Sequence, residues 1–230
     1  MRIIFVRHGE PDYQNDCLTE TGKMQAAAAA KRLAREGIRE IYTSPMGRAS
    51  QTAAYTAQEL GLPVTTLDYM HEISWGGPGI PHNGHPWTLS DWMISLEDYD
   101  FFHHDWRQHP YFKGNVAVEY LDSITAQFDE LILRQGYRHE GTRFLCETNA
   151  QKTIAVFSHG GSGGCVLAHL LALPFPYVCT VLPYEFTSII ILEFPVKPGE
   201  YVHPRIELFN DAAHIRNLSS GLVFQEKIDP

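Results

Sequence analysis

The sequence has few cysteines, and they form no pattern that would bind a metal or indicate a disulfide framework. Four occur in 230 residues, and none belongs to a C-x-x-C pair or has the spacing of zinc ligands. Cys165 and Cys179 lie in apolar runs, where a reduced, buried thiol is the ordinary state. We therefore expect a soluble protein of a reducing compartment, the cytoplasm.

Positive charge and long apolar segments are also scarce. The 18 Lys and Arg residues stand against 27 Asp and Glu, giving a formal net charge of −9, which argues against nucleic acid or an anionic membrane as the partner. The N-terminal apolar stretch is too short for a signal peptide. The apolar run 166–173 is far shorter than the roughly 20 residues that span a bilayer. A small anionic substrate stays open, because a few clustered arginines reverse the charge locally.

Strand and helix patterns alternate along the chain, which predicts an α/β fold with a mostly parallel sheet flanked by helices. With 44% hydrophobic and 20% charged residues, the composition is that of a globular protein, and we expect residues 1–230 to form a single domain. Ser44 and Pro45 suit the cap and first position of a helix. The expected strands cover residues 2–6, 40–43, 64–67, 153–157, 189–194 and 205–209, and the expected helices cover 21–35, 46–60, 118–132 and 164–171.

Two histidines follow strands at equivalent positions. The first expected strand runs into Arg7-His8-Gly9, and a later one runs into Ser158-His159-Gly160. In parallel sheets the reactive groups gather beyond the carboxyl ends of the strands. A glycine after each histidine lets the backbone turn or approach a ligand closely. The pattern predicts a site that contains both histidines.

Further motifs occur in a fixed order around these two. Residues 18–26 read L-T-x-x-G-x-x-Q-A, residues 44–53 read S-x-x-x-R-x-x-Q-T-A, and Asn210-Asp211 with His214 forms a late, less specific element. Together with the two histidine motifs, they resemble the histidine phosphatase superfamily, which includes cofactor-dependent phosphoglycerate mutase. The resemblance extends from residue 3 to residue 215 and implies the family's α/β fold with helices on both faces of the sheet.

The resemblance implies a role for each motif residue. His8 would be the nucleophile of a phosphomonoester hydrolase and would form a phosphohistidine. Arg7 and Arg48 would hold phosphoryl oxygens with their planar forks. His159 would be a further donor, strongest when protonated. A small phosphorylated substrate is expected, with no cofactor and no metal.

A leaving alkoxide also needs a proton. In phosphatase branches of the family, a glutamate in an L-x-E-I-like stretch supplies it, and residues 69–73 resemble that stretch. Glu72 is therefore the expected general acid. Glu10 and Asp68 remain alternatives.

The pattern of regular elements is lost between Trp75 and Phe112, where all four tryptophans occur. The resemblance places a substrate-facing, cap-like insertion at about residues 74–115. Its aromatic residues would either line a binding wall or bury one another in a small core. The segment is also rich in histidine, but no H-x-x-x-H pair occurs among His82, His85, His103, His104 and His109, so we expect no metal there.

Two other activities compete with the phosphatase. Residues 160–164 satisfy the G-x-S-x-G pattern of a serine hydrolase around Ser162, with Asp211 and His214 following in order. That interpretation leaves Arg7-His8-Gly9 and Arg48 unexplained. A phosphoglycerate mutase would share the catalytic residues, but its W-N pair and longer loop before residue 18 are missing here, so water is the expected acceptor. A non-catalytic phosphate-binding module is disfavoured because every catalytic residue type is present.

Overall fold

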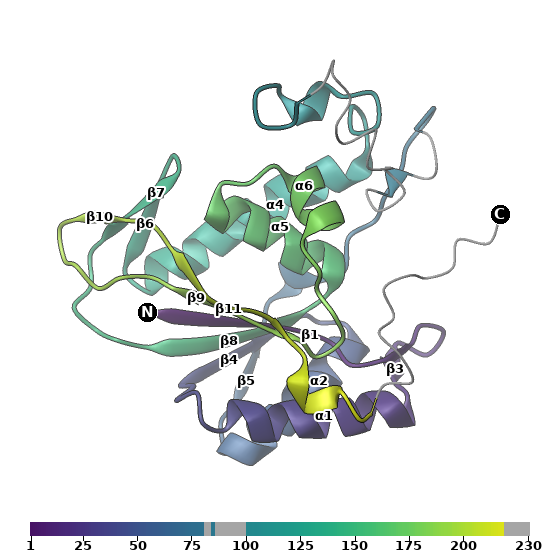
Figure 1. Ribbon diagram of the computed structural model, residues 1–230, viewed down its shortest axis with the longest axis vertical. Helices are drawn as coiled ribbons and strands as arrows, with labels where there is room; N and C mark the ends of the chain where they lie inside the picture. The colour runs from purple at the N-terminus through teal and green to yellow at the C-terminus, as the bar shows by residue number, and fades with distance from the viewer. Residues whose placement is uncertain (81–83, 86–99, 219–230) are drawn as a thin grey trace.

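A computed structural model describes residues 1–80, 84–85 and 100–218, whose largest element is a six-stranded sheet (Figure 1). The strand order is β11-β9-β1-β8-β4-β5. The neighbours β1, β8, β4 and β5 run parallel to one another. At the other edge, β9 pairs antiparallel with both of its neighbours, β1 and β11. The predicted mostly parallel α/β sheet is confirmed. The strands are β1 (Arg2–Arg7), β4 (Glu40–Thr43), β5 (Val64–Thr66), β8 (Thr153–Ser158), β9 (Ile189–Glu193) and β11 (Arg205–Asp211).

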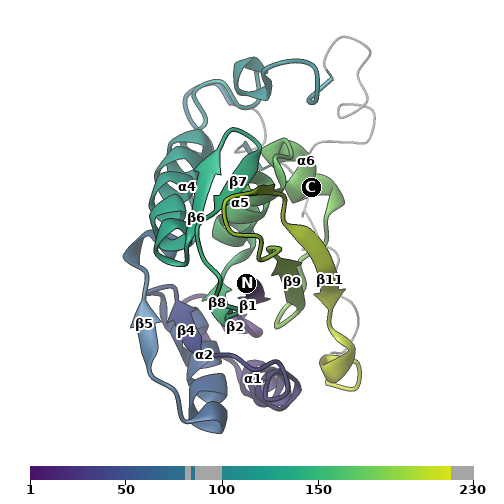
Figure 2. The same ribbon diagram turned by 90° about the vertical axis from the view of Figure 1, so that its left-hand side faces the viewer.

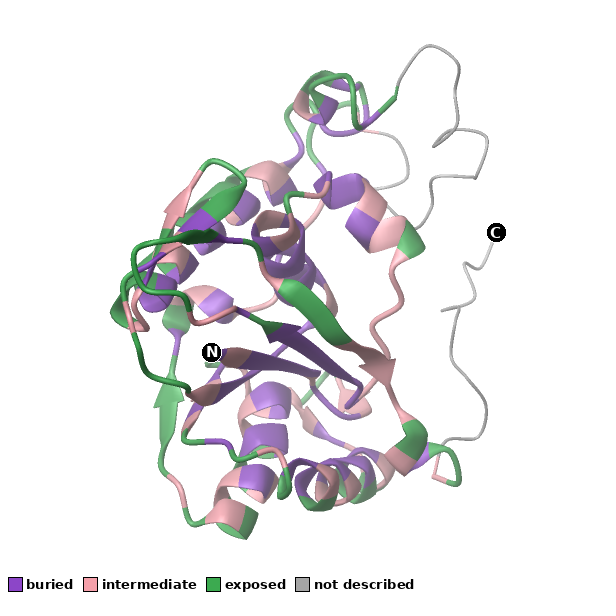
Figure 3. Ribbon diagram, turned by 60° about the vertical axis from the view of Figure 1, so that its left-hand side comes forward, coloured by how far each residue is buried: buried purple, intermediate pink, exposed green. Residues whose placement is uncertain are grey.

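Helices cover both faces of this sheet (Figure 2). One layer holds α1 (Glu20–Leu33) and α2 (Gly47–Leu60), and the other holds α4 (Val116–Arg134), α5 (Gly160–Leu171) and α6 (Phe175–Val181). A hydrophobic core lies on each side, and the central strands are buried on both faces (Figure 3). Burial on both faces explains why β1 and β8 read as continuous apolar runs. No helix in the described part of the chain is long and apolar enough to cross a bilayer.

Several short elements were not predicted. A three-stranded sheet contains β6 (Tyr137–Glu140), β7 (Arg143–Cys146) and β10 (Tyr201–Val202). These strands are too short, or too mixed in polarity, for a hydrophobic period to identify them. The other small elements are the pair β2 (Pro11–Asp12) and β3 (Cys17–Leu18) and the 3₁₀ helices η1 (Asp68–Met70), η4 (Trp106–Gln108) and η5 (Ala213–Ile215).

The predicted start of α2 is wrong. The helix begins at Gly47, and its N-cap is Met46, which makes no side-chain capping bond. Ser44 does not cap the helix. Its Oγ atom accepts the N–H of Met46 at 3.2 Å and lies 2.7 Å from Nε2 of His159. A tertiary contact therefore uses the hydroxyl that sequence alone assigns to the cap.

The predicted start of α5 is also wrong, because the glycine-rich segment is its first turn and the helix begins at Gly160. Because glycine is a poor helix former, the sequence predicted that the helix starts later, at Gly164. Close packing explains the glycines here: a Cβ on Gly161 would lie 2.6 Å from Oε1 of Glu72, and one on Gly163 would lie 2.6 Å from the ring of Tyr184.

Most of the described aromatic residues of the expected insertion pack into the core, whereas Phe102 is exposed. Trp75 stacks on Phe175 of α6, with ring centroids 5.7 Å apart. Trp106 is buried and meets Phe112 edge-on at 5.5 Å. These two tryptophans fit the interpretation of a packed core. Trp87, Trp92 and His82 lie outside the described residues.

Candidate active site

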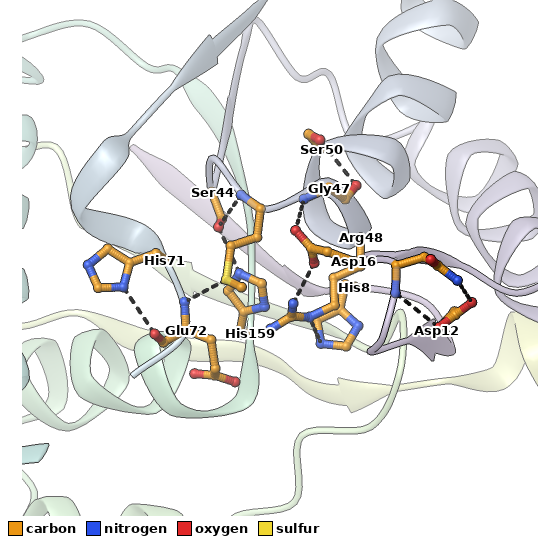
Figure 4. Close-up of polar contacts among 12 residues, drawn as sticks. His8, Asp12, Asp16, Ser44, Gly47, Arg48, Ser50, His71, Glu72 and His159 are labelled. Carbon is orange, nitrogen blue, oxygen red and sulfur yellow. Dashed lines mark hydrogen bonds and ion pairs between the residues drawn. The ribbon is translucent and has the colours of Figure 1, made fainter. Parts of the chain in front are cut away.

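The two motif histidines lie side by side at the carboxyl edge of the sheet. Strands β1 and β8 are parallel neighbours with Arg7 opposite Ser158, so the residues after each strand meet. The N–H of His8 donates to the carbonyl of Ser158 at 3.0 Å, and the His8 and His159 rings are 5.2 Å apart (Figure 4). The two strand ends therefore lie next to each other at this edge of the sheet, and both histidines are within reach of one ligand.

The imidazole of His8 is held in one tautomer. Its Nδ1 lies 2.7 Å from the carbonyl oxygen of Gly9, which can only accept, so Nδ1 carries the proton and Nε2 presents its lone pair. Nε of Arg48 donates to this Nε2 at 3.3 Å. Burial lowers the pKa of His8 well below its usual range, and the charges of Arg7 and Arg48 add to the effect. His8 is therefore neutral at physiological pH.

Gly9 lets this segment approach another backbone closely. A Cβ on Gly9 would lie 2.7 Å from the carbonyl oxygen of Gly22 in α1, and one on Gly22 would lie 2.1 Å from the carbonyl oxygen of Glu10. The predicted need for glycine after His8 is met, but the close neighbour is helix α1 rather than a ligand. The contact fixes the backbone that carries the acceptor of Nδ1.

Arg48 extends from the first turn of α2 and is almost fully buried. Its Nη1 donates to Oδ1 of Asp16 at 2.6 Å, and the N–H of Gly47 donates to Oδ2 of the same carboxylate at 2.6 Å. Asp16 has a φ of 46°, a left-handed conformation that aspartate tolerates better than most residues. The guanidinium is therefore fixed between the carboxylate of Asp16 and the imidazole of His8.

Arg7 is held by the segment between α6 and β9. Its Nη1 donates to the carbonyl of Tyr184 at 2.7 Å, and its guanidinium carbon lies 4.5 Å from the centre of the Phe186 ring. Among the residues that the structure describes, no acceptor partners its buried Nε. Such an unsatisfied donor is costly unless a ligand supplies an acceptor, and phosphoryl oxygens are suitable acceptors.

His159 is fully buried at the N-cap position of α5. Its Nε2 is 2.7 Å from Oγ of Ser44, while its Nδ1 has no partner within the described part of the chain. Burial lowers its pKa strongly, and His8, Arg48 and Arg7 lower it further. Three charged or polar neighbours and the lack of solvent therefore favour the neutral ring of His159.

Glu72 packs against the glycine-rich first turn of α5. Its Oε1 accepts the N–H of Ile73 at 3.0 Å and the N–H of Ser162 at 3.1 Å. Its own N–H donates to the sulfur of Met46 at 3.2 Å, which joins it to the residue preceding α2. The side chain of Glu72 is half-buried and is drawn in Figure 4. One carboxylate oxygen is thus fixed by the backbone.

The two alternative acids are placed differently. Oε1 of Glu10 accepts the hydroxyl of Thr19 at 2.7 Å, at the start of α1. Asp68 is exposed at the start of η1. Neither shares the contact that Glu72 makes with the helix directly after His159, so the geometry favours Glu72.

The structure does not assemble the alternative serine triad. The hydroxyl of Ser162 donates to the carbonyl of Met70 at 3.2 Å. His214 lies 3.2 Å from Oγ1 of Thr187, and Asp211 pairs with Arg32 at 3.3 Å. The three groups are engaged with different partners, so they do not form a nucleophile–base relay.

Two polar residues of the site, Asp16 and Ser44, were not predicted from the sequence. Asp16 lies in an irregular segment with no recognisable spacing relative to Arg48. Ser44 is the first residue of the S-x-x-x-R motif, and this position could have indicated that it belongs to the site. We expected it to cap a helix instead. Both residues contact groups that are distant in sequence, which is information that a local pattern lacks.

The sequence also matches known proteins. Residues 3–206 match the family model described as histidine phosphatase superfamily (branch 1). A Yersinia enterocolitica protein named probable phosphoglycerate mutase GpmB is 27% identical over 225 residues, which cover 94% of this chain and 95% of that protein. A Yersinia pestis protein of the same name is 28% identical over 184 residues and 76% of each chain.

Solved structures share the fold. A mycobacterial glucosyl-3-phosphoglycerate phosphatase in complex with inorganic phosphate matches with a TM-score of 0.62 and 24% identity, over 93% of this chain and 98% of that one. A phosphoserine phosphatase from Entamoeba histolytica in complex with 3-phosphoglyceric acid matches with a TM-score of 0.60 and 21% identity, with the same coverage. At these identities the likeness establishes the fold.

Proposed function

The chain belongs to the histidine phosphatase superfamily, and on that basis we propose that it is a phosphomonoester hydrolase that works through a phosphohistidine on His8. The observation that carries the proposal is the state of His8: a buried, neutral imidazole whose unprotonated Nε2 accepts a long hydrogen bond from the Arg48 guanidinium. That is the state a nitrogen nucleophile requires.

In the first step, Nε2 of His8 attacks the phosphorus, and the bond from phosphorus to the ester oxygen breaks. Phosphoryl transfer depends mainly on positioning and on donors to the equatorial oxygens. Arg48 is already at Nε2, and Arg7 contributes an unpartnered buried N–H. His159 donates through Nδ1, because Ser44 satisfies Nε2. Positive charge on the arginines offsets the charge of the phosphoryl group.

Glu72 supplies the proton to the leaving oxygen. Oε1 already accepts two backbone N–H groups, which leaves Oε2 as the oxygen that transfers the proton. After the first transfer Glu72 is a carboxylate, and it takes a proton from the water that attacks the phosphohistidine. The second step releases inorganic phosphate and restores neutral His8 and protonated Glu72.

A mutase is the second candidate, because the Yersinia relatives carry that name. The two activities share the first step and differ in what accepts the phosphoryl group. Hydrolysis is our choice because the segment between Glu10 and Leu18 is short and lacks the W-N pair of the mutase pattern. The substrate we propose is a small phosphomonoester, and the four free thiols fit a reducing compartment such as the cytoplasm.

Rapid-quench labelling tests the proposal. After brief exposure to a ³²P-labelled phosphomonoester, the protein should carry acid-labile, alkali-stable phosphate, and His8→Ala should carry none. His203→Ala is the matched control, because His203 is exposed and contacts the carbonyl of Thr142 instead of the site. Release of the label to water at the turnover rate supports the hydrolase. Release only on addition of a phosphoglycerate would support the mutase, and full activity of His8→Ala would overturn both.

A further inference from the structure

Three metal-ligating side chains converge at a point away from the candidate active site. Asp129 comes from α4, His139 from β6 and His169 from the last turn of α5. Nδ1 of His139 is 3.0 Å from Oδ1 of Asp129 and 3.0 Å from Nε2 of His169. That Nε2 is 2.8 Å from the same Oδ1. Within residues 1–80, 84–85 and 100–218, no other group of three such side chains gathers its ligand atoms so closely.

Hydrogen bonding alone cannot make all three contacts favourable while Asp129 is ionised, as an aspartate is at neutral pH. If both nitrogens carry protons, a donor faces a donor across 3.0 Å. If one nitrogen lacks its proton, its lone pair faces a carboxylate oxygen at 2.8 or 3.0 Å. A cation bound by the three atoms satisfies each of them at once.

The distances fit a metal ion. Two ligands at right angles around a metal with bonds of about 2.1 Å lie about 3.0 Å apart, and tetrahedral ligands lie about 3.4 Å apart. The observed edges of 2.8 to 3.0 Å therefore match one face of an octahedron. Two imidazoles and one carboxylate suit zinc and the neighbouring first-row divalent metals rather than Mg²⁺ or Ca²⁺.

The ligands are held in place by the fold and remain accessible. The ring of His139 stacks on the buried ring of Phe144, with centroids 4.2 Å apart and planes within 8°. The His139 and His169 rings meet edge-on at 4.4 Å. The side chains of His139, His169 and Asp129 are 11%, 23% and 32% exposed, so an ion can enter and keep water ligands.

We propose that Asp129, His139 and His169 form a binding site for a divalent transition-metal ion, with water completing its coordination. The ion would join the β6–β7 hairpin to α4 and α5 and stabilise that part of the fold. The site is separate from the phosphoryl-transfer chemistry, since His169 follows His159 by ten residues of helix, about 15 Å at 1.5 Å per residue.

Zinc titration of the full chain, freed of metal with a chelator, tests the proposal. Calorimetry with Zn²⁺ alone should give one equivalent per chain, and zinc at a hundredfold excess over its Kd should raise Tm by about 5 to 10 °C. Asp129→Asn and His169→Gln should each weaken binding at least tenfold and leave hydrolysis of p-nitrophenyl phosphate unchanged. His203→Ala should bind like the native protein.

Two further measurements separate this site from the active-site histidines and from effects on folding. His8→Ala should keep the equivalent of zinc, because His8 belongs to the active site and contributes no ligand here. Cobalt(II) added to the native protein should show d–d bands that differ from those of the aqueous ion and saturate at one equivalent, a readout that does not depend on the folding of a variant. Absence of saturable binding in the native protein, or equal affinity in Asp129→Asn and His169→Gln, would overturn the site.

Discussion

Asp16 and Arg48 form the contact that fixes the guanidinium of the candidate active site. Oδ1 of Asp16 accepts from Nη1 of Arg48 at 2.6 Å, while Nε of the same guanidinium donates to Nε2 of His8 at 3.3 Å. The arginine is almost fully buried, whereas the Asp16 side chain is 40% exposed. A surface carboxylate therefore orients a buried cation against the imidazole of His8.

Replacing Asp16 by Asn should lower kcat/KM about tenfold, or about 1.4 kcal/mol in transition-state stabilisation. The carboxylate accepts from both Arg48 and Gly47, and an amide has one acceptor oxygen where two are needed. Steady-state kinetics measure the effect. Asp12→Asn, in the same segment but bonded to Asn15, is the control and should stay within twofold. Unchanged kinetics in Asp16→Asn would show that Arg48 needs no such partner.

Replacing Ser44 by Ala should lower kcat at least tenfold and the free energy of unfolding by about 1 to 3 kcal/mol, because Nε2 of buried His159 loses its partner. Without that hydroxyl, nothing holds the proton of His159 on Nδ1. The ¹⁵N chemical shifts of labelled imidazole report this tautomer directly. Ser50→Ala removes a hydroxyl from the first turn of α2, where it bonds only the carbonyl of Gly47, and should change neither quantity. A native tautomer in Ser44→Ala would refute the assigned role.

Replacing Glu72 by Gln should slow kcat/KM much more for an alkyl phosphate than for p-nitrophenyl phosphate. An alkoxide needs a proton in order to leave, whereas nitrophenolate leaves without one. The glutamine oxygen can still accept from Ile73 and Ser162, so the local fold should remain. Parallel kcat/KM measurements on both esters report the steps up to His8 phosphorylation. Glu10→Gln is the control. Equal losses on the two esters would remove Glu72 as the acid.

Acid should destabilise the protein through its buried histidines. The pKa of His8 and that of His159 lie below the unfolded value of about 6.5, so below that pH the unfolded chain binds more protons than the folded one. The free energy of unfolding should therefore fall as pH drops from 7 to 5, by up to about 1.4 kcal/mol per pH unit for each histidine. These two groups add no pH dependence above about pH 7.5.

Urea unfolding at a series of pH values measures this slope. His8→Ala should reduce the slope of the unfolding free energy against pH by about the contribution of one histidine. His203→Ala, which removes an exposed imidazole, should leave the slope unchanged. An equally steep slope in His8→Ala would contradict the buried, neutral state of this residue.

The α/β architecture was predictable because each central strand carries its own signal. β1 and β8 are buried on both faces and read as apolar runs, and the histidine at each strand end follows from the same pattern. The first turn of α5 was not predictable, since glycine disfavours a helix and only the approach of Glu72 and Tyr184 explains its presence there.

Sequence motifs identified Arg48 and His8. They did not identify the residues that hydrogen-bond to Arg48 and to His159. Asp16 reaches Arg48 and Ser44 reaches His159 across contacts that no local spacing encodes. The same holds for Asp129, His139 and His169, which come from three different elements. The protonation of His159 could not be predicted from the sequence either. Burial lowers its pKa and favours the neutral ring, and burial is a property of the folded chain.

The pairing of β1 with β8 also sets when the protein can become active during refolding. The first strand of the chain and a strand that follows residue 150 must meet before His8 and His159 are neighbours. Contacts of such large sequence separation carry a high loop-closure cost and form slowly. Helices such as α1 and α4 depend on local contacts and form early. Recovery of catalytic activity should thus lag behind recovery of the far-ultraviolet circular dichroism signal. The delay between the two would measure how long the pairing of β1 with β8 takes.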